Sequence, residues 1–291
     1  MPTMPNGFVP TVAAYSHDAP MGVMRTDVAG GFGRYSLDFD RGTQRFNVTL
    51  MLDAAQFSIW TIFFLRIIKK GAVTFDMRLD TGLGTALHPV HIVPGSYSAT
   101  RTAGIVTIVS FVVETTSAVY ALSDAQVAAY GLSAATIPAG FVPKVAAYSM
   151  EAPGGNVRDD VPGGVAAYAL EHDRAPQKFS CLLMLTAAQY AVWCVWYHRL
   201  IGKGVRTFEM RLDSGFGPEP HACNILPGSY SATRTGGLLM AVSFAVEAES
   251  KAYDLSTIDA EDMVALYSEY GGFSSALLAR LATFALVDLS A

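Results

Sequence analysis

Two short motifs in this sequence place a carboxylate beside a hydroxyl group and a glycine. They are Asp80-Thr81-Gly82 and Asp213-Ser214-Gly215, one in each half of the chain. Two aspartates that face each other at short range cannot both ionise, so such a pair shares one proton and can serve as acid and base. If the fold brought Asp80 and Asp213 together, the chain could therefore carry out acid–base catalysis.

These motifs resemble the paired motifs of pepsin-like aspartic proteases, but the neighbouring residues differ. Those enzymes follow the motif with a small or hydroxyl residue, whereas Leu83 and Phe216 stand here. Arg78 and Arg211 would also place charge in a strand that the protease fold buries. We therefore interpret each aspartate as the start of a turn in which the glycine supplies a positive φ.

Two histidines, His88 and His221, lie eight residues after Asp80 and Asp213. A single histidine and one carboxylate in a loop lack the third ligand that a catalytic metal site needs. The sequence also lacks the motifs of serine hydrolases, zinc proteases and nucleotide-binding proteins. It thus predicts loop residues at a surface or interface, no metal or other cofactor, and no enzymatic activity.

The composition narrows the class of protein. The 291 residues are 51% hydrophobic and only 15% charged, with a mean hydropathy of +0.32. This excludes intrinsic disorder, and a net charge of −5 without a lysine or arginine run argues against nucleic-acid binding. Cys181, Cys194 and Cys223 are odd in number and form no CxxC motif, so we expect reduced, buried thiols.

Neither a signal peptide nor a membrane span is predicted. Residues 1–20 lack a basic region followed by an apolar one. The most apolar stretch, Phe57–Ile68, is about a dozen residues, short of the ~20 that cross a bilayer. We expect it to form a buried helix.

The dominant feature of the sequence is an internal repeat. Residues 7–116, here called the first copy, align without a gap to residues 140–249, the second copy, and 59 of the 110 pairs are identical. This offset of 133 residues predicts a domain at 1–116, a helical linker at 117–139, a second domain at 140–249 and a helical extension at 250–291.

Each copy contains the same succession of local signals. An apolar strand leads into a capping box, which marks the start of a helix with a wide apolar face. The helix carries basic residues near its end and stops at a glycine able to adopt a positive φ. These elements are the strands Phe46–Leu52 and Phe179–Leu185, the capping pairs Asp53/Gln56 and Thr186/Gln189, the basic pairs Arg66/Lys70 and Arg199/Lys203, and the glycines Gly71 and Gly204.

The remainder of each copy reads as β structure. Alternation over Val73–Leu79 predicts a half-exposed strand, and a loop and then a hairpin follow, with the first copy's turn at Ala103-Gly104. The fold class is therefore α+β, mainly antiparallel β. We expect two tandem β-sandwich or barrel modules, each with one long amphipathic helix, and a C-terminal helix over Ser274–Leu289.

The longest identical stretch is GSYSATRT, in which Tyr97 and Arg101 of the first copy correspond to Tyr230 and Arg234 of the second. Facing opposite charges stabilise hairpins, so we expect Arg101 to pair with Glu114 and Arg234 with Glu247. The stretch reads either as a polar strand face or as a contact strip between neighbouring modules.

The order of these elements resembles that of structural proteins of bacteriophage tails, of the distal-tail or tail-tube kind. The resemblance is carried by Gln56–Gly71, Phe75–Leu79, Pro94–Ser98 and Val109–Glu114, and by the same positions of the second copy. It implies a ring-forming virion subunit that contacts itself and other tail proteins. DNA would pass through the lumen without specific binding.

Scarce charge and a duplicated module also favour an obligate assembly, in which three chains would present six similar units. An alternative function is a tandem carbohydrate-binding protein that uses strips around Tyr97 and Tyr230. The aspartic protease is a third.

Overall fold

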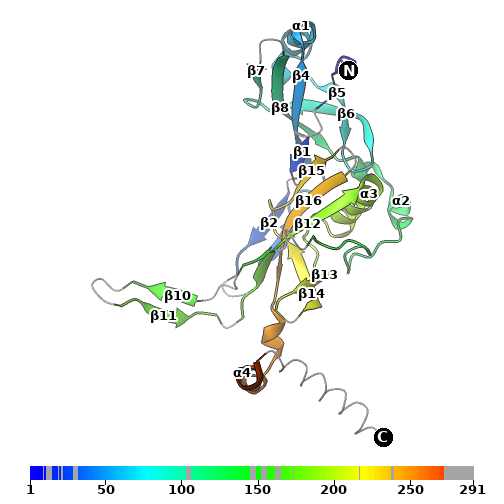
Figure 1. The fold of residues 1–291 in the computed structure, drawn as a ribbon. Helices are drawn as coiled ribbons and strands as arrows, with labels where there is room; N and C mark the ends of the chain where they lie inside the picture. The colour runs from blue at the N-terminus through cyan, green and yellow to red at the C-terminus, as the bar shows by residue number, and fades with distance from the viewer. Residues whose placement is uncertain are drawn as a thin grey trace.

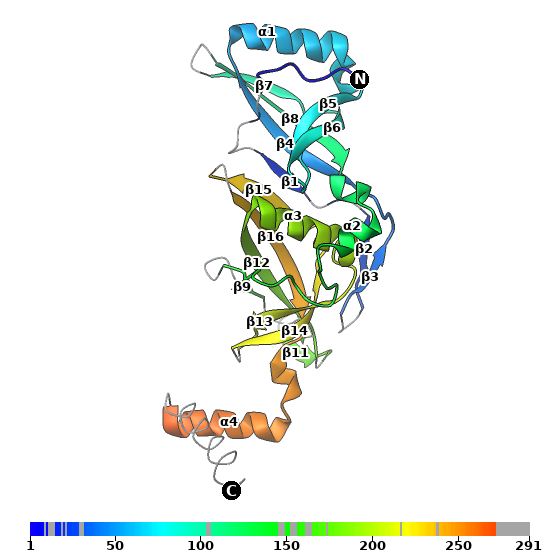
Figure 2. The ribbon, with the colours of Figure 1, turned by 90° about the vertical axis from the view of Figure 1, so that its right-hand side faces the viewer.

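The protein is described by a computed structural model that covers all residues except 9, 11–14, 19, 21, 29–31, 103–105, 145–148, 152–155, 161–164, 173, 216, 237–238 and 272–291. Figure 1 shows the first copy above the second, with α4 below both and the β10–β11 hairpin extending to one side. A quarter turn shows the same stacking of the two copies (Figure 2). The expected turn at Ala103-Gly104 and the expected helix at Ser274–Leu289 lie outside the described residues.

The first copy and the linker after it contain mainly β-strands. The elements are β1 (Ser16–Asp18), β2 (Val23–Thr26), β3 (Arg34–Leu37), β4 (Thr43–Leu52), α1 (Ala54–Ile62), the π-helical turn η2 (Phe63–Ile67), η3 (Lys69–Gly71), β5 (Phe75–Asp80), β6 (Thr85–Ile92), β7 (Ser98–Thr102), β8 (Val106–Thr116), η4 (Ala118–Ala121) and α2 (Asp124–Ala128).

The second copy and the extension after it repeat these elements at the offset of about 133 residues, except that η3 has no named counterpart and α4 is longer than α2. They are β9 (Ser149–Met150), β10 (Asn156–Asp159), β11 (Ala167–Leu170), β12 (Gln177–Thr186), α3 (Ala187–Val195), the π-helical turn η6 (Trp196–Leu200), β13 (Phe208–Asp213), β14 (Pro218–Ile225), β15 (Ser231–Thr235), β16 (Leu239–Ala248), η7 (Lys251–Asp254) and α4 (Thr257–Tyr270).

One 12-stranded sheet runs through both copies. Its main path is β13-β14-β16-β15-β1-β4-β8-β6-β5, with β12 and β7 as further partners of β16 and β8, and β9 beside β12. All its named strand pairs are antiparallel, which confirms the predicted mainly antiparallel α+β class. The short strand β1 joins the copies, because it pairs with β4 on one side and with β15 on the other.

The sequence signals act locally as expected. Both capping boxes are formed, since Asp53 and Thr186 accept from the backbone N–H of Gln56 and Gln189, whose side chains accept in return. Burial alternates along β4 and β8, and two separate apolar cores form, one around Trp60 and one around the equivalent Trp193. The three cysteines are free and buried, as predicted.

Two expectations about local structure are wrong. The stretch Phe57–Ile68 was expected to form a buried helix, but four of its large apolar side chains are 46–57% exposed: Ile59, Ile62, Leu65 and Ile67. The stretch after each Asp-Thr/Ser-Gly motif was expected to be a long loop, but β6 and β14 are strands that pair along their length with β5 and β13. The loop is confined to a tight turn, because the carboxylate of Asp80 or Asp213 accepts from two backbone N–H groups of the turn itself. None of the described helices is long and apolar enough to cross a membrane.

Candidate assembly interface

The two copies meet through a continuous piece of β-sheet. Strand β1 lies in register with β15, with Ser16 opposite Thr233 and His17 opposite Ala232. The Arg234 N–H donates to the Tyr15 carbonyl at 3.1 Å, which extends this ladder by one residue. A segment of the first copy therefore fills the edge of the second copy's sheet.

A histidine lies at the centre of this contact. The His17 side chain is fully buried, and its Nε2 shares a hydrogen bond with the Tyr190 hydroxyl. Its ring also lies 5.0 Å from that of Phe46 and 6.0 Å from that of Tyr230. Burial disfavours the charged imidazolium, and it lowers the pKa of His17 to about 4.

The turn after β5 packs directly onto α3. Gly82 has φ +113°, and a Cβ at this position would lie 2.6 Å from the Cβ and Sγ atoms of Cys194. The Tyr15 hydroxyl donates to the Asp80 carbonyl and accepts from the Asp80 N–H, both at 3.0 Å. The first motif thus has a packing role at the junction between the copies.

The linker covers the end of the second copy's helix. Tyr120 of η4 hydrogen bonds to His198 Nδ1 at 3.1 Å. Arg199 donates to the carbonyl of Leu122 and to Asp124, both at 2.7 Å. His198 is buried, and this burial lowers its pKa to about 3.

A second basic residue at this helix end reaches the first copy as well. The Lys203 ammonium donates to the carbonyl of Phe39 at 2.7 Å. The basic pair Arg199 and Lys203, expected to complement the helix dipole, therefore also ties the second copy to the linker and to the first copy.

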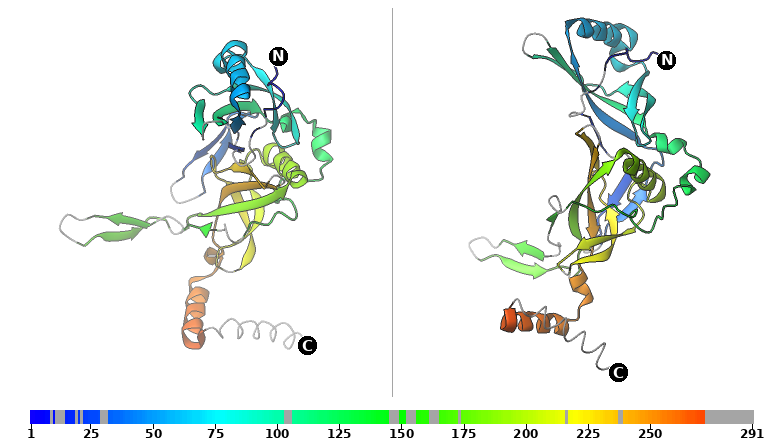
Figure 3. Two further views of the ribbon diagram at one scale, coloured as in Figure 1. Left: turned by 45° about the horizontal axis from the view of Figure 1, so that its top comes forward. Right: turned by 45° about the vertical axis from the view of Figure 1, so that its right-hand side comes forward.

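The β2–β3 hairpin carries an ion pair that crosses the interface. Arg25 lies 2.7 Å from Glu247, whose side chain is completely buried, and the Gly33 N–H also donates to this carboxylate at 3.3 Å. Figure 3 shows the hairpin beside the second copy, whereas its equivalent, β10–β11, projects from the body.

The six predicted contact residues divide between two surfaces. Tyr230 and Glu247 are buried where the copies meet, and Arg234 lines a cleft there with Tyr15 and Asp80. The remaining three belong to the equivalent surface of the first copy and are exposed or half-buried: Tyr97, Arg101 and Glu114.

The expected ion pairs across the closing hairpins are wrong. The register places Arg101 opposite Thr107 and Arg234 opposite Met240, several residues from either glutamate. Glu114 instead lies 3.9 Å from Arg45 on the neighbouring strand. Glu247 pairs with Arg25, which is remote in sequence.

The two aspartates do not form a dyad. Asp80 ends β5 and Asp213 ends β13, and these strands are the two ends of the sheet's main path. Figures 1 and 2 place the strands at opposite ends of the body. Gly82 and Gly215 have φ values of +113° and +112°, so the interpretation of both motifs as turns is confirmed.

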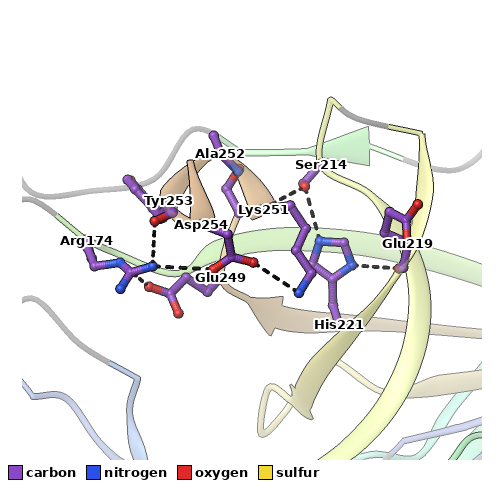
Figure 4. A network of polar contacts seen from close by, with 10 residues as sticks. Arg174, Ser214, Glu219, His221, Glu249, Lys251, Ala252, Tyr253 and Asp254 are labelled. Atoms are coloured by element: carbon purple, nitrogen blue, oxygen red, sulfur yellow. Dashed lines mark hydrogen bonds and ion pairs between the residues drawn. The ribbon is translucent and has the colours of Figure 1, made fainter. Parts of the chain in front are cut away.

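His88 and His221 lie on strands and are buried rather than placed in a flexible loop. Figure 4 shows that His221 Nδ1–H donates to the Glu219 carbonyl, which leaves Nε2 to accept from Ser214, 3.1 Å away. The Ser214 oxygen also accepts from the Lys251 N–H at 3.2 Å. This chain of contacts fixes η7 to the turn.

The first copy contains the same arrangement, in which Thr81 contacts His88 at 3.3 Å and accepts from the Ala118 N–H. Each histidine therefore anchors the 3-10 helix that follows its copy. Among the described residues, neither ring is hydrogen-bonded to a carboxylate.

The tyrosine strips offer no shared sugar platform. Tyr230 is only 2% exposed and stacks on Tyr197 with ring centroids 4.7 Å apart. Tyr97 stacks on Phe64 in the same way at 4.3 Å and is half-buried. Of these two tyrosines, only Tyr97 is therefore partly accessible to a glycan.

No cluster of three or more metal-binding side chains occurs among the residues that the structure describes. The chain matches no known protein-family model, and no curated protein is found as a relative.

Several interface residues were missed from the sequence, namely His17, Arg25, Tyr120 and Tyr190. One signal could have indicated two of them. His17 corresponds to Met150 and Tyr190 to Phe57, so both partners of one contact change from polar to apolar between the copies.

Proposed function

We propose that this chain is a non-enzymatic structural subunit of a bacteriophage tail, which assembles with copies of itself into a ring at the tail tube or the distal tail. Each copy of the repeat forms one β-sandwich or barrel module, so a trimer presents six similar units. Other tail proteins are its further partners, and the virion is its location.

One observation carries the self-assembly. The first copy exposes a row of large apolar side chains on its helix: Ile59, Ile62, Leu65 and Ile67, which are 46–57% exposed. In the second copy, Val195 and His198, the equivalents of Ile62 and Leu65, are 0% and 3% exposed. An apolar surface of this kind, solvent-exposed in one chain, is typical of a protein–protein interface.

The charge pattern supports the same function. The first copy's helix carries no acidic residue in its first turn, and its exposed side is apolar apart from small hydroxyl residues and the basic residues at its end. The phage-tail assignment itself is based on the order of elements described above, and the ring follows from the duplication.

The test is the oligomeric state of the purified chain, measured by light scattering and negative-stain microscopy at micromolar concentrations. We expect closed rings with six lobes. A monodisperse monomer over the whole concentration range would contradict the proposed function.

A surface variant separates assembly from folding. Ile62→Ser with Leu65→Ser removes exposed apolar area, so it should dissociate the rings while leaving the melting temperature of the dissociated chain nearly unchanged. Met51→Ser is the matched control, because Met51 is 56% exposed on β4 and away from the helix. It should leave the rings intact.

A further inference from the structure

In the part of the chain that the structure describes, two sheet edges lack a partner where their equivalents have one. Among the described strands, β7 pairs only with β8, and all five of its residues are exposed. The equivalent strand β15 has the same sequence, SATRT, but pairs with both β16 and β1. Natural proteins rarely leave such an edge uncovered, since it invites pairing with another chain.

The second open edge is that of β9. Among the described strands it pairs only with β12, with Met150 opposite Phe179 and Ser149 opposite Ser180. Its equivalent, β1, uses its other edge to bind β15. Within the chain, β1 is a donor strand that binds the edge of β15, which is its acceptor. The equivalent donor strand β9 and the equivalent acceptor edge of β7 have no described partner on that side.

The side chains of the first copy near the open edge of β7 are compatible with those of β9 and η7. Inside the chain, His17 meets Tyr190, and the equivalent positions hold Met150 and Phe57. Tyr120 likewise meets His198, and the equivalents are Tyr253 and Leu65. The His17–Tyr190 contact inside the chain would therefore become an apolar Met150–Phe57 contact between chains. At the second position the Tyr253 ring would pack against Leu65, which offers its hydroxyl no hydrogen bond.

The projecting hairpin completes the match. Inside the chain, Arg25 of β2–β3 pairs with the buried Glu247. The equivalent Arg158 on β10 contacts its neighbour Asp160 at 2.8 Å, and its side chain is 56% exposed. The equivalent of Glu247 is Glu114, which lies on β8 of the first copy with its side chain 38% exposed.

We propose that β9, the β10–β11 hairpin and η7 of one chain bind the first copy of a second chain in the way that β1, β2–β3 and η4 bind the second copy within one chain. The expected register places Ser149 opposite Thr100 and Met150 opposite Ala99. Arg158 pairs with Glu114 of the neighbouring chain. This inference depends on the proposed self-assembly and specifies its interface.

The register can be tested with paired cysteines. Because Arg234 N–H binds the Tyr15 carbonyl, the next pair, Ser16 and Thr233, is a non-hydrogen-bonded pair, in which side chains approach most closely. Its equivalent between chains is Ser149 and Thr100. The variant Ser149→Cys with Thr100→Cys should give a ladder of disulfide-linked oligomers under mild oxidation.

Three controls accompany this variant. Each single cysteine should give no ladder beyond the dimer, and Ser149→Cys with Ala99→Cys should link poorly, because neighbouring strand residues point to opposite faces. Ser16→Cys with Thr233→Cys should form a disulfide within one chain and so shows that this register permits the bond.

The ion pair gives a second, independent test. Arg158→Glu should raise the concentration needed for half-assembly by roughly tenfold or more, since like charges would meet at the interface. Adding Glu114→Arg to the same chain should restore assembly. Both variants should melt like the wild type when dissociated.

The outcomes distinguish the two proposals. If the wild type never assembles, the proposed function fails. If it assembles, but the Ser149/Thr100 variant forms no ladder and Arg158→Glu assembles normally, the self-assembly stands and this interface is overturned. A ladder together with charge rescue supports both.

Discussion

Arg25 and Glu247 form an ion pair of 2.7 Å between the two copies of the repeat, and the Glu247 side chain is completely shielded from water. The arginine is 21% exposed, so the pair lies at the border of the interface with its acidic end inside. A buried carboxylate is tolerated only when it is paired and hydrogen-bonded. The hairpin that carries Arg25 therefore supplies the cation that this buried carboxylate needs, together with a hydrogen bond from the Gly33 N–H.

Arg25→Ala should destabilise the chain strongly. The substitution leaves Glu247 buried without its cation, a situation that typically costs about 3–5 kcal/mol. Urea unfolding followed by tryptophan fluorescence measures the loss. Arg45→Ala is the matched control, because its ion pair with Glu114 is 3.9 Å long and exposed, and such pairs contribute about 0–1 kcal/mol. Equal effects of the two substitutions would contradict this account.

Gly82→Ala and Gly215→Ala should differ, although the residues are equivalent. Both glycines have a φ near +112°, so both substitutions carry a similar backbone strain of about 1–2 kcal/mol. Only at Gly82 would the new Cβ meet another group, Cys194 at 2.6 Å, whereas nothing described lies within 4 Å at Gly215. We expect an additional loss of about 1–3 kcal/mol for Gly82→Ala. Thermal unfolding of dilute protein measures the stability of both variants. Equal melting temperatures would contradict this prediction, because they would show that the structure around Cys194 accommodates the new Cβ at no cost.

Sequence patterns predicted those parts of the fold that depend on interactions between residues close together in the sequence. The capping residues Asp53 and Thr186 each satisfy the backbone three residues ahead, so their effect is visible in a short stretch of sequence. The alternation that gave β5 and β13 depends on one buried face of each strand. The strands β6 and β14 were missed because the glycines and prolines around them are typical of a loop. Their extended structure depends on pairing with β5 and β13, which the local sequence does not reveal.

The interface itself could not be predicted, because it depends on contacts between distant residues. Arg25 and Glu247 are far apart in sequence, and nothing near either residue indicates the other. A hairpin rule paired Glu247 with Arg234, but the register separates them. Tyr230 and Glu247, which the duplication singled out as candidate assembly contacts, are buried and contact His17 and Arg25 of the first copy within the chain. Their part in contacts between chains stays a prediction.

The three cysteines should not react with a thiol reagent in the folded chain. Burial raises the pKa of the Cys181 thiol to about 12, and it raises those of Cys194 and Cys223 as well. The thiolate is the reactive species, so its scarcity and its burial act together. Titration with Ellman's reagent at pH 8 should detect no rapid thiol in native protein and all three in urea. Rapid reaction of a native thiol would indicate that the core opens locally, and the cross-linking tests would then need a background without cysteines.

The junction between the copies should weaken as the pH falls. In the unfolded chain a histidine takes up its proton near pH 6.5, whereas the pKa values of the buried His17 and His198 are lowered to about 4 and about 3. Between pH 6.5 and 4 the unfolded state therefore binds more protons than the folded state, and the free energy of unfolding decreases with falling pH. A difference of this size corresponds to roughly 3 kcal/mol for His17 alone.

A variant that tests this pH dependence takes its replacement residues from the equivalent positions in the first copy's open surface and in β9. His17→Met with Tyr190→Phe copies the Met150/Phe57 pair, and His198→Leu copies Leu65, so the triple variant removes both histidines while keeping each site filled. Unfolding free energies at pH 7 and pH 4.5 should then differ less than in the wild type. His91→Asn copies Asn224 at an exposed site and should leave the wild-type difference unchanged. If the triple variant kept the full pH dependence, the loss of stability would have to come from the carboxylates, which both proteins share.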